Sequence, residues 1–346
     1  FISPTDARTS PPAACTNSQP APYRTITINN GADYWTIDNL NINNGIWISG
    51  RNVNDAYNWL TNLVKAGDWQ TRRTAPGHGT GNRPATDTLT NFLRGVTGKP
   101  DLDPVTNIRI LNNTITGRGI YGSLTSDGVI SGNTISDIPC GIGPGIWLMT
   151  FSNGWQVTNN DVSDIAESAA AHYMQEGIRF GSAANFNDIS FNRVHDLPGD
   201  GRGINTDVDA SWNRIHDNTV TNVAIGYNDQ MSGWGNTWEH NVVDGYRVYG
   251  FGFRLMDGKL AAPSLASSTN KPLVLCNVTS RPLTDRATSI GAGGLMGATF
   301  AGNDVQKVWF SKNIQTYWSA VGNTWDGSSV LPSKTPPFNP ALCGGA

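Results

Sequence analysis

The fold is decided by a short phrase that first stands at Asn113-Thr114-Ile115 and returns at Asn133-Thr134-Ile135: an Asn, a small or polar residue, then Ile or Val. Further copies are Asn160-Asp161-Val162, Asn192-Arg193-Val194, Asn218-Thr219-Val220 and Asn241-Val242-Val243, with a looser one at Asn277-Val278-Thr279. The spacings are 20, 27, 32, 26, 23 and 36 residues. The shortest spacing is about one turn of a strand solenoid, so the repeat indicates one coil per phrase with loops of varying length.

Asn is suited to two tasks in such a coil. Each coil must turn sharply between strands, and Asn tolerates the left-handed backbone conformation better than most residues that carry a Cβ. Asn side chains on successive coils can also hydrogen-bond along the stack, as amide ladders do. We therefore predict that these Asn residues occupy left-handed turns and form a ladder.

The composition favours strands and turns over helices. The chain has 346 residues, of which 15% are charged and 39 are Gly, and Asn, Ser and Thr are abundant. The net charge of −3 argues against nucleic-acid binding. No apolar run approaches the length that crosses a bilayer, so we expect no membrane partner.

The cysteines and the first residue indicate a secreted, extracellular protein. Cys15, Cys140, Cys276 and Cys343 are far apart and lack metal-ligand spacing. An even, dispersed set suits two disulfides in a secreted protein, and free buried thiols are the alternative. Because the chain begins at Phe1 and not at Met, we expect that an N-terminal segment has been removed.

We predict one solenoid domain over residues 1–346, with a small insertion and two arms. Within residues 51–104, Val53, Ala56, Tyr57 and Leu60 fall at helical spacing, and a second helical pattern follows, so this segment predicts a helical hairpin. The Arg- and Trp-containing loop between its helices is either a wall of a binding site or a solvated loop. Residues 1–22 and 332–346 are expected to be extended arms.

A second phrase marks a strand in each coil: a small residue, an apolar residue, and then alternation. Its copies are Gly119-Ile120-Tyr121-Gly122-Ser123, Gly145-Ile146-Trp147-Leu148-Met149, Gly177-Ile178-Arg179-Phe180-Gly181, Gly203-Ile204-Asn205-Thr206-Asp207, Ala224-Ile225-Gly226-Tyr227-Asn228 and Gly250-Phe251-Gly252-Phe253-Arg254, with an earlier strand at Ile46-Trp47-Ile48-Ser49. Side chains alternate along a strand, so the second and fourth residues fill the core, and the third and fifth point to solvent.

Stacking these strands predicts one outer face with an unusual composition. It would carry Trp47, Ser49, Tyr121, Ser123, Trp147, Met149, Arg179, Asn205, Asp207, Asn228 and Arg254. Aromatic residues at one end, with charges and amides at the other, suit a long sugar polymer, because flat rings stack on sugars and polar groups bind hydroxyls. The alternative is that the three aromatic residues form a local core beneath the insertion.

These patterns resemble the right-handed parallel β-helix superfamily of pectate lyases, polygalacturonases, chondroitinase- and alginate-lyase-like enzymes and mannuronan epimerases. The resemblance spans about residues 25–325 and implies an all-β fold with a substrate groove along one sheet. Asn205-Thr206-Asp207, followed one coil later by Asn228-Asp229 and then by Gly250-Phe251-Gly252, is similar to the active-site strands of polygalacturonase-like hydrolases. Asn228 and Phe251 depart from that pattern, where those enzymes carry Asp and His, and no Arg-x-Lys follows.

Hydrolysis of a glycosidic bond needs a protonated carboxyl and an ionised one. We predict Asp207 and Asp229 as this pair, with Glu176 or Asp209 as replacement. A structural ladder of these acids with Arg179 and Arg254 is the alternative.

Elimination on a uronate polymer is the rival chemistry, since it needs a base and a cation that stabilises the enolate. Arg179, Arg254, His172, Tyr173 and Lys259 would supply both, with Ca²⁺ as a further cation if acids converge. His195, His216 and His240 occupy different strands or faces, so we expect no metal cluster from them.

We therefore expect a polysaccharide-cleaving enzyme without a cofactor, with hydrolysis ahead of elimination, acting as a monomer or small homo-oligomer. The candidate substrate-binding residues are Arg179, Arg254, Asn205, Asn228, His172, Tyr173, Trp147, Tyr121, Trp47 and Lys259. A non-catalytic adhesin, tail-fibre or filament subunit is the alternative of a different class, because β-helices also serve as rigid spacers.

Overall fold

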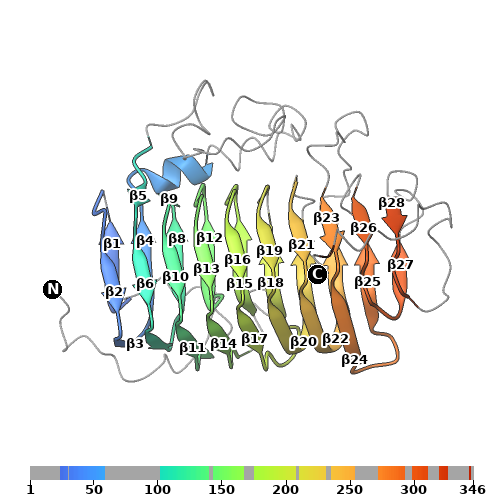
Figure 1. Cartoon of the computed structure of the whole chain (residues 1–346). Coiled ribbons are helices and arrows are strands. Elements are labelled where there is room, and N and C mark those ends of the chain that lie inside the picture. The colour runs from blue at the N-terminus through green and yellow to red at the C-terminus, as the bar shows by residue number, and fades with distance from the viewer. Residues whose placement is uncertain are drawn as a thin grey trace.

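The structure is a computed structural model that describes residues 24–29, 31–58, 102–139, 143–166, 175–207, 210–230, 235–253, 272–292, 298–310, 319–325 and 343. Its strands stack in parallel register into a right-handed parallel β-helix, as predicted (Figure 1). The main body consists of a sixteen-stranded and a ten-stranded sheet. Among the described residues, no helix is long and apolar enough to span a membrane.

The sixteen-stranded sheet bends into two arms. Arm 1 contains β1 (Ile26–Asn29), β4 (Ile46–Ser49), β8 (Ile120–Ser123), β12 (Ile146–Met149), β15 (Glu176–Gly181), β18 (Arg202–Thr206), β25 (Thr288–Ala292) and β27 (Val308–Phe310). Arm 2 contains β3 (Asn41–Asn43), β7 (Thr114–Thr116), β11 (Thr134–Ser136), β14 (Asp161–Ser163), β17 (Arg193–His195) and β24 (Val278–Pro282). The long strands β20 (Thr219–Asp229) and β22 (Val242–Phe253) run through both arms.

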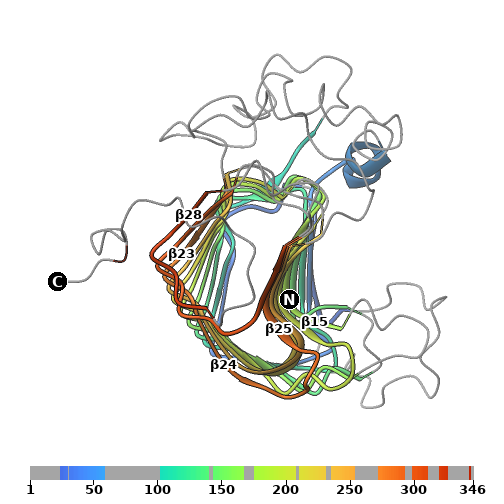
Figure 2. The same ribbon diagram turned by 90° about the vertical axis from the view of Figure 1, so that its right-hand side faces the viewer.

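The ten-stranded sheet forms the opposite side of each coil. It contains β2 (Thr36–Asp38), β6 (Arg109–Leu111), β10 (Val129–Ser131), β13 (Gln156–Thr158), β16 (Asp188–Ser190), β19 (Arg214–His216), β21 (Thr237–Glu239), β23 (Leu273–Leu275), β26 (Thr299–Ala301) and β28 (Ser319–Val321). A separate pair is formed by β5 (Val105–Thr106) and β9 (Thr125–Ser126). Viewed along the stack in Figure 2, β15 and β25 of arm 1, β24 of arm 2, and β23 and β28 enclose one core.

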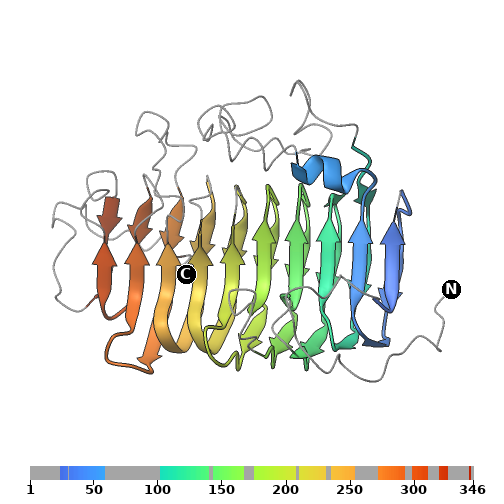
Figure 3. The same cartoon turned by 180° about the vertical axis from the view of Figure 1, so that it is seen from behind.

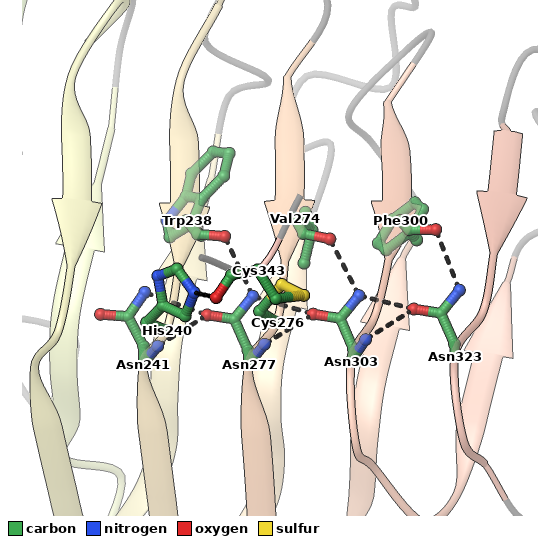
Figure 4. Close-up of a disulfide and its surroundings, with 10 residues drawn as sticks. All are labelled: Trp238, His240, Asn241, Val274, Cys276, Asn277, Phe300, Asn303, Asn323 and Cys343. Atoms are coloured by element: carbon green, nitrogen blue, oxygen red, sulfur yellow. Dashed lines mark hydrogen bonds between the residues drawn. A yellow bond between two sulfur atoms is a disulfide. The ribbon is translucent and has the colours of Figure 1, made fainter. Parts of the chain in front are cut away.

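The Asn ladder is confirmed at the turn between the ten-stranded sheet and arm 2. It runs through Asn113, Asn133, Asn160, Asn192, Asn218, Asn241, Asn277, Asn303 and Asn323, each bonded to the next through its side chain. Each Nδ2 also donates to a backbone carbonyl of the preceding coil, as Asn277 does to Trp238 (Figure 4).

The left-handed turn falls on the residue before the ladder Asn, so that part of the prediction is wrong. Asn112, Asn159 and Asp217 have φ near +55°, at 53°, 56° and 53°. The ladder residues themselves leave this conformation because their backbone N–H groups bond to the Asn side chain of the next coil, as Asn113 N does to Asn133 Oδ1 at 3.0 Å. Each corner therefore uses two adjacent residues: the first adopts the left-handed conformation and the second forms the ladder.

Most of the predicted insertion, residues 59–101, lies outside the described residues. Residues 53–58 are helical, and Ala56 packs with Leu124 and Phe151 in a small second core outside the solenoid. The rest of that helix, the second predicted helix and most of both predicted arms lie outside the described residues. Cys343 forms a disulfide with Cys276, with 5.6 Å between their Cα atoms, whereas Cys15 and Cys140 lie outside that part of the chain.

Candidate functional site on the outer face of arm 1

Alternation along arm 1 separates a core row from an outward row. Ile120, Ile146, Ile178 and Ile204 pair from coil to coil and are buried in the core. The outward row, one residue further on, is Thr27, Trp47, Tyr121, Trp147, Arg179, Asn205, Asn228, Gly252, Gly291 and Trp309. Figure 3 shows arm 1 with its strands side by side in this order. We call this surface the outer face.

One coil takes a different register from the predicted one. Tyr227, and not Ile225, pairs with Ile204, because Ile225 pairs with Arg202. The predicted phrase is therefore displaced by two residues in this coil. A shift of two keeps the parity of the strand, so Tyr227 still points to the core and Asn228 to the outer face.

The aromatic end of the outer face is a continuous chain of ring contacts. Trp47 stacks on Tyr121 with ring centroids 4.0 Å apart, and Tyr121 meets Trp147 edge to face at 5.1 Å. The guanidinium of Arg179 then lies over the Trp147 ring, 5.3 Å from its centroid. This cation–π contact joins the aromatic end to the charged end.

Arg179 holds two of the predicted acids together. Its Nη1 donates to Glu176 Oε2 at 2.8 Å, and its Nη2 donates to Asp207 Oδ2. Glu176 also accepts from Arg202 Nη1 at 3.2 Å and from Asn205 Nδ2 at 2.6 Å. The Glu176 side chain is 0% exposed, whereas Asp207 is 11% exposed, so Asp207 is the one of the two that reaches solvent.

The amide residues continue the network toward the next coil. Asn228 Nδ2 donates to Asn205 Oδ1 at 2.5 Å, and both residues are fully buried. The expectation that this row points to solvent is therefore wrong for Asn205 and Asn228, whereas the aromatic residues and Arg179 are partly exposed. Asn228 Oδ1 and the indole N–H of Trp147 are buried without a hydrogen-bond partner within the described structure.

Two pKa shifts describe the electrostatics of the site. Burial alone would lower the pKa of Arg179, but Glu176 and Asp207 outweigh it and raise that pKa above its ordinary value. Burial raises the pKa of Tyr121 to about 12. Both groups therefore remain protonated near neutral pH, Arg179 as a cation and Tyr121 as a neutral phenol.

Asp229 does not join this cluster. Asp229 pairs with Thr206 of the preceding coil, which in turn pairs with Phe180, and it pairs with Phe253 of the following coil. Its position therefore belongs to the core row. It is 1% exposed and accepts a hydrogen bond from Thr206 Oγ1 at 3.1 Å. The adjacency of Asn205-Thr206-Asp207 and Asn228-Asp229 on successive coils is as expected, but the pairing of Asp207 with Asp229 is replaced by that of Asp207 with Glu176.

The remaining predicted site residues lie outside the part of the chain that the structure describes. They are Asp209, Arg254, His172, Tyr173 and Lys259. Within the described part, no group of three His, Cys, Asp or Glu residues is arranged to hold a metal ion.

The sequence analysis missed a row of charged residues at the start of the arm 1 strands. Its signal is a charged residue before Gly-Ile, in Arg118-Gly119-Ile120, Glu176-Gly177-Ile178 and Arg202-Gly203-Ile204. A Cβ at Gly203 would lie 2.4 Å from both Val220 Cγ1 and Gly226 O, so the position demands Gly. The residue before it then points to the outer face.

Comparisons with known proteins find similarity in architecture. Neither models of protein families nor curated protein sequences match the chain. The periplasmic alginate epimerase AlgG matches with a TM-score of 0.41 and 10% identity, over 64% of this chain and 46% of the epimerase. DFA-IIIase from Arthrobacter chlorophenolicus A6, in a structure without its lid and in complex with GF2, matches with a TM-score of 0.47 and 10% identity, over 90% of this chain and 82% of that chain. The chain thus spans less than half the length of the epimerase, and at this identity neither match assigns an activity.

Proposed function

We propose that the protein is a secreted enzyme that hydrolyses glycosidic bonds of a polysaccharide lying along the outer face of arm 1. The observation that carries the proposal is the joint placement of Asp207 and Glu176 on the Arg179 guanidinium, at the end of a row of aromatic rings. Beside this pair, Trp47, Tyr121 and Trp147 are partly exposed, so they supply apolar contact for neighbouring sugars.

The two carboxylates take different roles because they differ in accessibility. Asp207 is the carboxyl that substrate can reach and it is ion-paired with Arg179, so we assign it the base that takes a proton from the attacking water and returns that proton to the leaving glycosidic oxygen. Glu176 is fully covered and accepts bonds from Arg179, Arg202 and Asn205. It therefore positions Arg179, and through it Asp207, without touching the substrate.

The unpaired polar atoms beside the cluster also suit a sugar. The indole N–H of Trp147 is a donor, and Asn228 Oδ1 is an acceptor. A buried polar group without a partner is unfavourable, and sugar hydroxyls can both accept and donate hydrogen bonds.

Elimination is less well supported by the described residues. It needs a group that accepts a proton from carbon near neutral pH. Arg179 and Tyr121 both have raised pKa values, so neither accepts a proton there, and Arg24, whose pKa is lowered to about 10, still remains largely protonated near neutral pH. The disulfide of Cys276 with Cys343 suits the oxidising environment of a secreted protein.

The test is a panel of neutral, uronate and sulfated polysaccharides, assayed for new reducing ends and for the ultraviolet absorbance of an unsaturated uronate. Hydrolysis predicts reducing ends without that absorbance, and its appearance would replace hydrolysis by elimination. Asp207→Asn should lower turnover by about a hundredfold or more while polymer binding survives. Asp38→Asn, the same change at an exposed position on β2 of the ten-stranded sheet, is the control and should keep full activity.

A further inference from the structure

Two tripeptides of this chain have the form Asn-x-Thr, the sequon that accepts N-linked glycans in secreted proteins: Asn112-Asn113-Thr114 and Asn277-Val278-Thr279. No other Asn of the sequence is followed two positions later by Ser or Thr. The two copies read alike, but they are displaced by one residue relative to the Asn ladder. Asn112 occupies the left-handed turn before ladder residue Asn113, whereas Asn277 is itself a ladder residue.

Asn112 presents its amide nitrogen at the surface. The residue is exposed, with φ 53°, at the corner between β6 and β7. Its Oδ1 faces the next coil, where a Cβ at Gly132 would lie 2.5 Å from it. Its Nδ2 donates to Asp38 Oδ1 at 3.1 Å, in an exposed contact. An amide nitrogen carries two hydrogens, so the second is available for a covalent bond, and Thr114 of the same sequon is exposed as well.

Asn277 offers no such nitrogen in the folded chain. It is 0% exposed, and its Nδ2 uses both hydrogens, one toward Trp238 O at 3.0 Å and one toward Asn303 Oδ1 at 2.9 Å (Figure 4). A glycan would replace one of these hydrogens and would need space between close-packed coils. A chain that carries a glycan on Asn277 therefore cannot close the ladder at this coil.

The sequon at Asn277 results from one Thr in the core row of arm 2. Thr279 pairs with Val243, and the other coils carry Ile or Val at this position up to Val243. Thr279 is 5% exposed, and its Oγ1 is buried without a hydrogen-bond partner in the described structure. The hydroxyl therefore contributes no bond to the fold, and Thr279 fills the place of an apolar residue. The sequon at Asn277 is thus a by-product of the ladder pattern.

We propose that Asn112 carries an N-linked glycan when the chain is exported through a compartment that supplies a lipid-pyrophosphate-linked oligosaccharide, and that Asn277 stays unmodified. The Asn112 amide nitrogen bonds to the anomeric carbon of the first sugar, its proton passes to a base of the transferase, and the bond from that carbon to the lipid pyrophosphate breaks. This inference rests on the secretion in the proposed function but not on the hydrolysis.

The glycan would stand away from the candidate site. Asn112 lies at the corner between the ten-stranded sheet and arm 2, since it separates β6 from β7. In Figure 2 this corner lies between β23 and β24, across the coil from β15 of arm 1. A glycan at Asn112 therefore leaves the outer face open.

The experiment secretes the whole chain from a eukaryotic host and maps glycans by mass spectrometry of peptides from the secreted, folded protein. We expect one glycan, on Asn112, which an endoglycosidase removes without denaturation because the site is exposed. Thr114→Val keeps the β-branched shape at an exposed strand position and should abolish the glycan, whereas Thr114→Ser should retain it. Thr279→Val removes the other sequon and should leave the glycan in place, with a secreted yield equal to or above that of wild type.

Folding and modification are separated by the melting temperature, which Thr114→Val should share with the deglycosylated wild type. An unmodified Asn112 in the secreted wild type, or a glycan on Asn277 of the folded protein, would overturn the inference. Polymer binding and cleavage should be equal before and after the glycan is removed, and a difference would contradict the placement of Asn112 away from the outer face. A glycan on Asn112 together with no cleavage of any polymer would support the modification site and contradict the proposed hydrolysis.

Discussion

The Asn ladder is tested most sharply at Asn277, whose surroundings are drawn in Figure 4. Its Oδ1 accepts from Asn241 N and Nδ2 at 3.0 and 3.1 Å. Its Nδ2 donates to Trp238 O at 3.0 Å and to Asn303 Oδ1 at 2.9 Å. The side chain is fully buried, so water cannot replace these bonds.

Asn277→Ala leaves the buried N–H of Asn241 without a partner. Asn241 Nδ2 keeps Ile215 O, Asn303 Oδ1 keeps the Asn277 backbone N–H, and Trp238 keeps its place in the pairing of β21 with β23. An unsatisfied buried group costs about 1–3 kcal/mol, so the variant should lose about 1–3 kcal/mol of unfolding free energy. That loss is large against the roughly 5–15 kcal/mol by which domains are stable.

Asn277→Asp keeps the shape of the side chain and changes its chemistry. An ionised carboxylate would place an oxygen against Trp238 O and Asn303 Oδ1, which are both acceptors. Burial and these acceptors raise the pKa of the new carboxyl above the unfolded value of about 3.9. The group therefore stabilises the folded state most below that pH, and this contribution is lost as pH rises through the raised pKa.

Urea unfolding followed by circular dichroism, at acidic and at neutral pH, measures both variants. Asn41→Ala is the matched control, because Asn41 is an exposed strand residue of arm 2 that pairs with Thr114 outside the ladder. It should change stability by less than about 0.5 kcal/mol. The ladder account is refuted if Asn277→Ala loses under about 1 kcal/mol, or if Asn277→Asp is no less stable at neutral pH than at acidic pH relative to wild type.

Three further predictions concern packing, cross-linking and ionisation. Gly119→Ala should lose about 3 kcal/mol or more in urea unfolding, because the new Cβ would lie 1.9 Å from Gly145 O. Gly181→Ala should be tolerated, because its Cβ would make ordinary contacts with Asp207 Cβ at 3.5 Å and Arg179 Nε at 3.8 Å. Reduction of the Cys276–Cys343 disulfide, which closes a loop of sequence separation 67, should lower stability by about 4 kcal/mol, and an unchanged urea midpoint after thiol treatment would contradict this. Because the pKa of Tyr121 is raised to about 12, the unfolded state should ionise first above about pH 10, so stability should fall between these two values, and Tyr121→Phe should reduce that slope.

The repeat architecture was predictable because one residue type performs one local task in every coil. The phrase that begins at Asn113 identifies ladder residues by the Ile or Val two positions after the Asn. That β-branched residue enters the core directly after the turn. A second ladder at the other end of the ten-stranded sheet was missed, although Asn187-Asp188-Ile189 and Asn213-Arg214-Ile215 carry the same phrase. Asn187 Nδ2 donates to Asn213 Oδ1 at 2.9 Å, which is the geometry of the first ladder.

The sequence predicted which face of the sheet carries the site, but not how deeply its side chains are buried. Strand parity places Arg179 and Asn205 on the outer face, and the structure brings Arg179 to Asp207 as expected. Parity says nothing about what lies above a strand, so the complete burial of Asn205 could not be read from the alternation. Glu176 was predicted as a replacement in the acid pair, but its link to Asp207 through Arg179 could not be read from the alternation, because Glu176 lies three residues before Arg179.

The ladder and the candidate site depend on the same register. Ladder bonds between Asn192 and Asn218 fix the offset of two successive coils at one corner. Strand β20 begins beside that corner at Thr219 and continues to Asn228 on the outer face without a break in the strand. A slip of one residue would move Asn228 into the core row and bring Asp229 to the outer face. The contact of Asn228 with Asn205, and through it with Glu176, therefore requires the observed register of β20 against β18.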